Sequence, residues 1–216
     1  MFTGIVEEIG MVNAITRGSS CMQLVIGCSK VLSDVTKGDS ISVNGVCLTV
    51  STYTATHFIA DIMPETFKAT TLSYMKRGNA VNLERAMPAN GRFGGHIVSG
   101  HIDSIGKIAD LRKKENALYV DIHIDDSLLI YLVPKGSVTV DGTSLTIINV
   151  FDKGFTISLI PTTQIDSIIG QRRIGDYVNI ECDILAKYIE RILMKQKTHS
   201  DGGLTMESLT MNGFIG

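Results

Sequence analysis

The chain has 216 residues, 44% hydrophobic and 19% charged, and its 20 basic and 22 acidic residues give a formal net charge of −2. This composition is typical of a folded globular protein and excludes the disordered and fibrous classes. A slightly acidic chain with no basic run longer than residues 112–114 also argues against nucleic acid or an anionic membrane as a partner.

The N-terminus does not predict export. Residues 1–3 are followed by acidic residues rather than by a basic and then apolar signal region, and the longest strongly apolar run, residues 128–133, is far shorter than the roughly 20 residues of a membrane helix. The four cysteines include no C-x-x-C pair, so neither zinc nor redox spacing is present. A disulfide between Cys21 and Cys28 is one alternative, but free thiols in a reducing cytoplasm are the simpler prediction.

An internal repeat organises the chain. At a shift of 97 residues, positions 40–84 align without a gap on positions 137–181, so that SISVNGVCLTV lies on SVTVDGTSLTI and GNAVNLE lies on GDYVNIE. At a shift of 96, TGIVEEIG at residues 3–10 matches SGHIDSIG at residues 99–106. Each half is long enough to bury a modest core, and the period is too long for a solenoid unit. The sequence therefore predicts a tandem duplication into two similar domains.

In chain order, each half consists of short alternating runs separated by turn signals. Residues 40–43 and 118–124 are typical of strands, whereas Asn44-Gly45 and Asp141-Gly142 are typical of turns. Many short strands with little helical periodicity indicate a small closed barrel or sandwich in each half. Because both turn pairs tolerate the positive φ angles of a type I′ turn, the strands that return from them begin at equivalent positions.

After Asp183 the pattern changes to helical spacing. The apolar stripe consists of Tyr188, Ile189, Ile192 and Leu193. It predicts one short amphipathic helix, which is marginal alone at about a dozen residues and must pack on a barrel or on copies of itself. Residues 198–216, rich in Ser, Thr, Gly and Met, have no clear periodicity and are expected to form a flexible tail.

The most unusual stretch is GRFGGHIVSGH at residues 91–101, whose glycines permit bends and close backbone approach. His96 and His101 would face opposite sides of an unbroken strand, and no third ligand of known spacing follows, so no metal site is predicted. Two surface histidines in an interdomain linker are the simpler interpretation. Against it, this segment begins the second repeat, where its counterpart is the N-terminus.

Equivalent positions in the two repeats hold small polar side chains. Cys47 aligns with Ser144, and each side chain could form a hydrogen bond or act as a nucleophile. A Cys in an alternating strand, however, is most often a small buried hydrophobe. Prolines 64 and 161 end alternating runs and leave hydroxyls and a carboxylate at a rim, which suits a polyhydroxylated ligand. Asp61 and Glu65 can equally be solvated rim charges. The sequence contains no phosphate loop, dinucleotide fingerprint or nucleophile elbow.

Eight segments together resemble the riboflavin synthases, the duplicated lumazine-binding-domain enzymes, over about residues 1–194. They are MFTGIVEEIG, GDSISVNGVCLTV, MPET, GNAVNLERA, GGHIVSGHID, KGSVTVDGTSLTI, LIPTT and KYIERIL. The resemblance implies an all-β fold of two tandem six-stranded Greek-key barrels, at residues 1–97 and 98–186. It also implies a C-terminal helix at residues 187–197 that joins a homotrimer, followed by the tail.

The resemblance implies a reaction in which two molecules of 6,7-dimethyl-8-ribityllumazine dismutate by transfer of a four-carbon unit. The products are riboflavin and 5-amino-6-(ribitylamino)uracil, and no metal or redox cofactor is needed. Non-catalytic lumazine or flavin carriers, including antenna proteins, share the duplicated fold and are the alternative. An FAD-binding reductase barrel would need a nucleotide-binding domain after the barrel. Enclosure by a lumazine synthase capsid is left open.

Site residues are carried over from the family position by position. The first pocket would be lined by Gly4, Ile5, Val6, Cys47, Leu48, Thr49, Asp61, Ile62, Met63, Pro64, Glu65 and Thr66. The second would be lined by Gly100, His101, Ile102, Lys135, Ser144, Leu145, Thr146, Ile160, Pro161, Thr162, Thr163, Gln164 and Ile165. The residues implicated in turnover are Phe2, Ser40, Cys47, His96 and His101. The chemistry needs a proton taken from the C7 methyl group of one lumazine and addition at C7 of the other, which these side chains are suited to assist. Which pocket holds the donor is left open.

Overall fold

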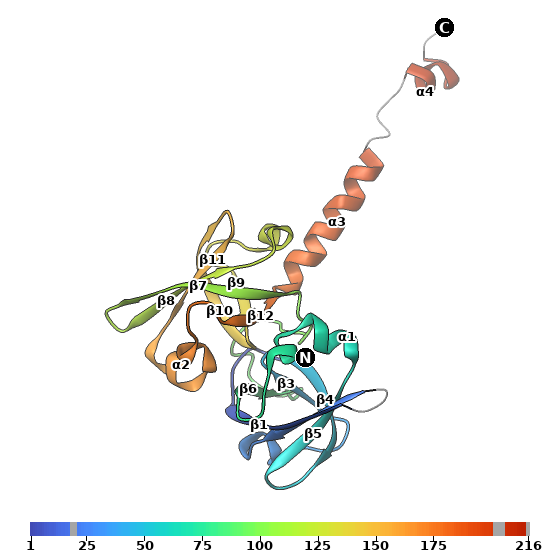
Figure 1. The fold of residues 1–216 in the computed structure, drawn as a ribbon. Helices are drawn as coiled ribbons and strands as arrows, with labels where there is room; N and C mark the ends of the chain where they lie inside the picture. The colour runs from blue at the N-terminus through green and yellow to red at the C-terminus, as the bar shows by residue number, and fades with distance from the viewer. Residues whose placement is uncertain (18–20, 201–205, 215–216) are drawn as a thin grey trace. The chain divides into compact units, whose positions relative to one another are not determined.

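The computed structural model describes residues 1–17, 21–200 and 206–214. Figure 1 shows two barrels, each a closed sheet of six antiparallel strands. The first barrel contains β1 (Glu8–Arg17), β2 (Met22–Gly27), β3 (Ser40–Val43), β4 (Val46–Tyr53), β5 (His57–Ile62) and β6 (Ala80–Arg85). The second contains β7 (Ser104–Lys114), β8 (Ala117–His123), β9 (Ser137–Val140), β10 (Thr143–Phe151), β11 (Gly154–Leu159) and β12 (Tyr177–Cys182).

The two barrels have the same topology. Strands neighbour one another in the order β1-β2-β5-β4-β3-β6 in the first barrel, and the second closes in the equivalent order β7-β8-β11-β10-β9-β12. Bulges also recur at equivalent places, in β1 and β7 and again in β4 and β10. A bulge bends its strand and increases the local twist, which closes a small barrel. The predicted duplication and barrel class are confirmed.

The predicted turns are of the expected kind. Asn44 and Gly45 have φ angles of 47° and 82°, and Asp141 and Gly142 have 44° and 77°. Both pairs therefore lie in the left-handed region that a type I′ hairpin requires. They connect β3 to β4 and β9 to β10, with Ser42 paired to Cys47 and Thr139 paired to Ser144.

Each barrel encloses its own apolar core. Strand alternation directs Leu48 and Phe58 into the first core and the equivalent Leu145 and Phe155 into the second. All four are at most 8% exposed. Fully burying a large apolar side chain contributes about 1.5–3 kcal/mol, so these positions stabilise the barrels directly.

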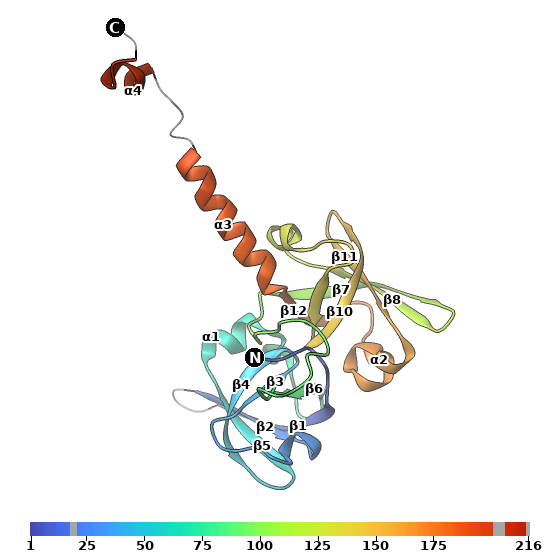
Figure 2. The same cartoon turned by 180° about the vertical axis from the view of Figure 1, so that it is seen from behind.

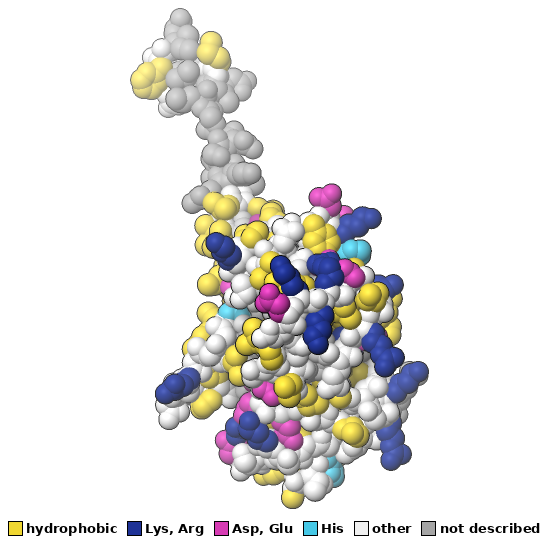
Figure 3. Space-filling view, turned by 90° about the vertical axis from the view of Figure 1, so that its left-hand side faces the viewer, with side chains coloured by type: hydrophobic (Ala, Val, Ile, Leu, Met, Phe, Trp, Pro, Cys, Tyr) yellow, Lys and Arg dark blue, Asp and Glu magenta, His cyan; other side chains and the backbone are white. Residues whose placement is uncertain are grey.

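Short helical segments close the barrels at matching positions. They are η1 (Lys30–Leu32), α1 (Pro64–Ala69), η2 (Thr71–Tyr74), η3 (Asp126–Tyr131), α2 (Pro161–Asp166) and η4 (Ile168–Gln171). The prolines stand at the first turn of α1 and α2, where the missing N–H has no helical partner to lose. Figure 2 shows the same arrangement from behind. On the face in Figure 3, basic and acidic side chains are interspersed.

Reciprocal asparagine contacts join the barrels, which together form one compact unit, Met1–Asp183. Asn82 in β6 and its equivalent, Asn179 in β12, each bind backbone groups of the opposite repeat. The four bonds are Asn82 Nδ2 to Asp141 O, Ile168 N to Asn82 Oδ1, Asn179 Nδ2 to Asn44 O and Thr71 N to Asn179 Oδ1, each 2.8 Å long. The barrels are thus related by a local pseudo-twofold axis, and the side-chain amides of both asparagines are hydrogen-bonded to the opposite repeat.

The remaining residues, Ile184–Gly216, form a second unit. Helix α3 (Ile184–Ser200) is longer than the predicted 187–197, because Leu185 lies three and four positions before Tyr188 and Ile189 and extends the apolar stripe by a turn. A further short helix, α4 (Met206–Met211), follows within the predicted tail, of which residues 201–205 and 215–216 lie outside the described residues. None of the described helices is long and apolar enough to cross a membrane.

Candidate functional site

The segment that leads into each barrel crosses to the other one. Before β1, Gly4 accepts a hydrogen bond at its carbonyl from the Ser144 N–H, at 2.7 Å; before β7, the Gly100 carbonyl accepts one from the Cys47 N–H, at 2.9 Å. Phe2 pairs with Val98 in an antiparallel bridge that joins the two segments. The equivalent strand positions Cys47 and Ser144 are therefore each covered from the opposite repeat.

Only glycine fits at the two crossing points. Gly4 and Gly100 have φ angles of +78° and +82°, which glycine adopts without strain. A Cβ at Gly4 would lie 2.7 Å from the Ser144 Cβ, and one at Gly100 would lie 2.6 Å from the Cys47 Cβ. The backbone therefore touches these two side chains directly.

This crossing corrects the predicted grouping of residues. Gly4 was expected at the first pocket and Gly100 with Ile102 at the second, but Gly4 contacts Ser144, whereas Ile102 packs against the core of the first barrel. A repeat aligned residue by residue keeps each leading segment with its own barrel, and nothing in the sequence signals the exchange. Ile5 is 47% exposed and Val6 half-buried beside the crossing.

Two buried glutamates hold the crossing segments. Glu84 Oε1 accepts the Thr3 N–H at 2.7 Å and the Thr3 hydroxyl at 2.8 Å, and its Oε2 accepts the Gly4 N–H at 2.9 Å. Glu181 makes the same three contacts with Ser99 and Gly100, at 2.7, 2.6 and 3.0 Å. Burial raises the pKa of the Glu84 carboxyl, and the N–H and O–H donors of Thr3 oppose that rise. The predicted site omitted both glutamates, although Glu84 and Glu181 are identical in the repeat alignment.

The outward face of each hairpin strand carries the other predicted groups. Cys47 and Ser144 are half-buried and Thr49 and Thr146 exposed, whereas Leu48 and Leu145 between them point inward. The side chains of Leu48, Leu145 and Ile62 belong to the cores rather than to the pockets, which corrects the prediction. Strand alternation is the physical reason, since neighbouring side chains take opposite faces.

The starts of α1 and α2 form the rims of these faces. Met63 is 63% exposed, and Ile160 and Ile165 are 60% and 73% exposed, so both faces are open and partly apolar. The other rim residues are exposed or half-buried; they are Pro64, Glu65, Thr66, Pro161, Thr162 and Thr163.

Two of the polar residues assigned to the pockets, Gln164 and Asp61, make side-chain hydrogen bonds within the barrels. Gln164 donates to the Leu159 and Asn116 carbonyls, both at 2.8 Å, and so anchors α2. Asp61 accepts from Gln23 Nε2 at 2.9 Å. Lys135 is exposed, with a left-handed φ of 69° in the turn before β9.

A histidine stands beside the second face. His96 is 8% exposed, and its Nδ1 lies 2.7 Å from Ser144 Oγ while its Nε2 lies 3.1 Å from Thr139 Oγ1. Burial lowers its pKa below the ordinary 6.5, and the nearby Asp183 carboxylate opposes this shift. The lowered pKa favours the neutral imidazole, whose two ring nitrogens lie within hydrogen-bond distance of the Ser144 and Thr139 hydroxyls.

The remaining turnover candidates are dispersed. Ser40 lines a cavity of about 440 Å³ that also contains Thr3 and Glu84. Phe2 is completely buried, and its ring lies next to Gly100 in the crossing segment. His101 is exposed next to Gly100. Over the described part of the chain, no group of three or more His, Cys, Asp or Glu side chains is placed to hold a metal ion.

Comparison with known proteins defines the class first. The description "Lumazine binding domain" matches the chain twice, at residues 3–86 and 99–183. A crystal structure of LumP complexed with riboflavin superposes with a TM-score of 0.78 at 28% identity and covers 84% of this chain and 99% of that one. Another, with 6,7-dimethyl-8-(1'-D-ribityl) lumazine, has a TM-score of 0.76 at 27% identity over the same shares of the two chains. The protein is thus a duplicated lumazine-binding-domain protein.

More similar sequences narrow the class. Riboflavin synthase of Bacillus subtilis (strain 168) is 50% identical over 215 residues, which cover 99% of this chain and 100% of that protein. Riboflavin synthase of Actinobacillus pleuropneumoniae is 46% identical over the same shares. The chain belongs to the riboflavin synthase family.

Proposed function

We propose that this protein catalyses the dismutation of two molecules of 6,7-dimethyl-8-ribityllumazine. One molecule gives a four-carbon unit to the other, so that riboflavin and 5-amino-6-(ribitylamino)uracil are released. The observation that carries this proposal is the pair of matching faces, with Cys47 and Ser144 at equivalent outward positions and Gly100 and Gly4 closing over them. A condensation between two identical molecules needs two such faces, and full-length similarity to riboflavin synthases supports the assignment.

The geometry would contribute mainly through proximity. Two lumazines held face to face react as if they were one molecule, and effective molarities in well-oriented systems reach about 10⁵–10⁸ M. The C7 methyl group of one lumazine must lose a proton and its carbon must then attack C7 of the other. The neutral imidazole of His96, bound to Ser144 Oγ, is suited to relay that proton. The reaction balances without an external oxidant or reductant, since two lumazine molecules together contain the same atoms as riboflavin and the uracil.

A non-catalytic carrier is the second candidate, favoured by the likeness to the LumP complexes. Such a carrier needs one good face, whereas this chain retains matching outward residues and a crossing glycine in both repeats. Incubating the purified protein with the lumazine alone, and following riboflavin by absorbance, separates the two. An enzyme forms one riboflavin for every two lumazines consumed. A carrier binds the lumazine and forms none, which would refute the proposal.

The active assembly is proposed to be a homotrimer that unites the first face of one subunit with the second face of its neighbour. The exposed rims at Met63 and Ile160 support this, because an open face leaves a bound heterocycle in water unless a neighbour covers it. The stripe of α3 supplies the subunit contact; Tyr188, Ile189 and Ile192 are 57–63% exposed. Sedimentation velocity tests the trimer directly.

Two finer expectations accompany this proposal. Cys21, Cys28 and Cys47 are free thiols, which supports a reducing cytoplasm as the compartment. A complex with lumazine synthase stays a prediction, and co-sedimentation of the two purified proteins would test it.

A further inference from the structure

The face of the second barrel holds three side chains in hydrogen-bond contact. His96 Nδ1 lies 2.7 Å from Ser144 Oγ, and His96 Nε2 lies 3.1 Å from Thr139 Oγ1. Thr139 and Ser144 are opposite each other on β9 and β10, so their hydroxyls lie on the same side of the hairpin. Thr139 is 1% exposed and His96 is 8% exposed, whereas Ser144 is half-buried. A ligand on this face would therefore reach the three side chains at Ser144.

The crossing segments hold the imidazole against the hairpin. The His96 N–H donates to the Thr3 carbonyl at 3.1 Å, and a Cβ at Gly95 would lie only 2.8 Å from the Ser144 Cβ. Within the described part of the chain, the Thr139 and Ser144 hydroxyls have no hydrogen-bond partner other than this ring. Each ring nitrogen therefore has one fixed hydroxyl partner.

The two contacts of the ring differ in length. A neutral imidazole has one N–H and one lone pair, so it donates one of these bonds and accepts the other. Bonds donated by a hydroxyl are commonly about 2.7–2.8 Å long, and those donated by an N–H are commonly about 2.9–3.0 Å long. The 2.7 Å contact therefore fits Ser144 as an O–H donor to Nδ1, and the 3.1 Å contact fits an N–H at Nε2 that donates to Thr139.

We propose that Thr139 is a positioning residue that holds His96 as the Nε2–H tautomer, so that Nδ1 can take the Ser144 proton. This role rests on the proposed riboflavin-forming activity. As the Ser144 oxygen accepts a proton from the lumazine C7 methyl group, its own proton passes to Nδ1. The methyl C–H and the original O–H bonds break, a new O–H and an N–H bond form, and the C–H electron pair stays on the lumazine. In the other tautomer Nδ1 already carries hydrogen, so Ser144 would have no base.

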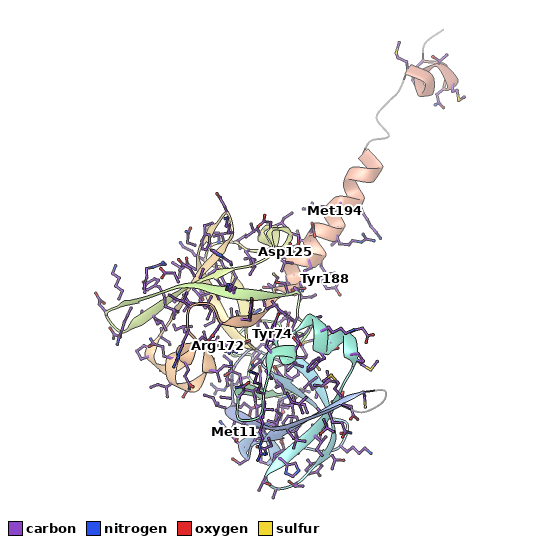
Figure 4. The ribbon with its side chains drawn as sticks, viewed as in Figure 1. Met11, Tyr74, Asp125, Arg172, Tyr188 and Met194 are labelled. Carbon is purple, nitrogen blue, oxygen red and sulfur yellow. The ribbon has the colours of Figure 1, made fainter. Side chains whose placement is uncertain are left out.

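The surroundings of the ring suit the imidazolium that this step forms. Thr139 Oγ1 can keep accepting the Nε2–H bond. Burial lowers the pKa of His96, and the Asp183 carboxylate opposes that shift and so favours the charged ring. Arg172, which Figure 4 labels, is bound at the turn of the same hairpin, where its Nε donates to Asp141 Oδ2 at 3.1 Å. That cation is therefore compensated by its own carboxylate.

Removing the Thr139 hydroxyl tests its role in turnover. Thr139→Val keeps the shape of the side chain but leaves Nε2–H without an acceptor, so kcat for riboflavin formation should fall about tenfold. KM should change by less than about twofold, because the tautomer is needed for proton transfer and not for binding. Thr139→Ser retains the hydroxyl and should keep kcat within about twofold of the unchanged chain. In a chain that carries Ser144→Ala, adding Thr139→Val should lower kcat little further.

Nitrogen-15 NMR of histidine-labelled protein measures the tautomer without turnover. The signals of His96 are those that disappear in His96→Gln. The unchanged chain and Thr139→Ser should show a protonated Nε2 and an unprotonated Nδ1. Thr139→Val should show a larger share of the tautomer protonated at Nδ1.

Thr156→Val is the matched control. Thr156 is a buried threonine on β11 of the same barrel, and its hydroxyl donates to Asp121 Oδ1 at 2.7 Å. Its loss should change neither kcat nor the His96 tautomer.

Four outcomes would overturn the proposal. They are an Nδ1–H tautomer in the unchanged chain, an unchanged tautomer in Thr139→Val, a changed tautomer with undiminished kcat, and equal losses of kcat in Thr139→Val and Thr139→Ser. If the unchanged chain forms no riboflavin, the proposed function fails instead, and the NMR measurement still decides whether Thr139 sets the tautomer.

Discussion

Neutralising one of the two buried glutamates should impair the pocket face of the opposite barrel. Glu181 lies in the second barrel, yet the segment that it holds, Ser99–Gly100, covers Cys47 in the first. Glu84 lies in the first barrel and holds Gly4 against Ser144 in the second. We therefore expect Glu181→Gln to weaken ligand binding at the first face and Glu84→Gln to weaken it at the second.

The size of the effect follows from the contacts. The single oxygen of glutamine can still accept both hydrogen bonds from residue 99. Its NH2 group, however, would replace the Glu181 Oε2 that accepts the Gly100 N–H at 3.0 Å, so two donors would face each other. A hydrogen bond to a charged group contributes about 1.5–3 kcal/mol, and every 1.4 kcal/mol is tenfold in an equilibrium constant. If ligand binding has to restore the displaced segment, its affinity should fall about tenfold to a hundredfold at that face.

Two blocking backgrounds let each face be measured separately. Cys47→Trp fills the first face, so the remaining riboflavin binding, followed by fluorescence quenching, reports the second; Ser144→Trp does the reverse. Adding Glu84→Gln to the Cys47→Trp chain should then reduce binding, whereas adding Glu181→Gln should not. Glu115→Gln, in the exposed turn between β7 and β8, is the control for loss of one negative charge.

The opposite pattern would refute the reasoning. If Glu84→Gln impaired the face of its own barrel and spared the other, the leading segments would not position the faces that they cover. Equal losses at both faces would mean that the substitutions loosen the whole unit. A urea titration of each variant measures that second effect independently.

Three further predictions concern turnover, assembly and pH. Cys47→Ala and His101→Ala should each lower riboflavin formation at least tenfold while changing the free energy of unfolding by no more than about 1 kcal/mol, because neither side chain lies in a core; early melting with unchanged activity per folded molecule would contradict this. Replacing Ile192 and Leu193 together with Asp should give inactive monomers in sedimentation velocity, and a fully active monomer would contradict the link between assembly and catalysis. Burial holds the pKa of His96 below its unfolded value of 6.5, so the stability that it contributes is present above pH 6.5 and is lost as pH falls through the folded pKa. Urea titrations between pH 7.5 and 5 should therefore show a shallower loss for His96→Gln, and identical slopes would exclude this role.

Much of the fold could be predicted because duplication repeats its signals. Asn44-Gly45 and Asp141-Gly142 mark two hairpins with the correct φ angles, and the alternation around Cys47 and Ser144 gives their outward direction. The same alternation should have removed Leu48 from the pocket, since it directs that side chain inward. Strand alternation alone was therefore sufficient to place the Leu48 side chain, but the pocket residues were taken from the family positions instead.

The crossing of the leading segments could not be predicted, because it joins residues far apart in the sequence. Gly4 and Ser144 are distant in sequence, and a glycine's need for positive φ says nothing about which strand it will meet. Glu84 was visible only as an identity between repeats, which a buried strand position would also explain. Its three hydrogen bonds to residues 3 and 4 become apparent only in three dimensions.

The asparagine contacts between the barrels bear on how such a chain could arise. Asn82 binds the second repeat with the same atoms that Asn179 uses on the first, so the contact surface of one barrel is complementary to another copy of itself. Self-complementary surfaces of this kind are the defining property of twofold homodimers. A single ancestral barrel could therefore have paired with its own copy before any fusion. Fusion into one chain would then have allowed one copy to change while the other kept its residue, as at Met75 and Arg172.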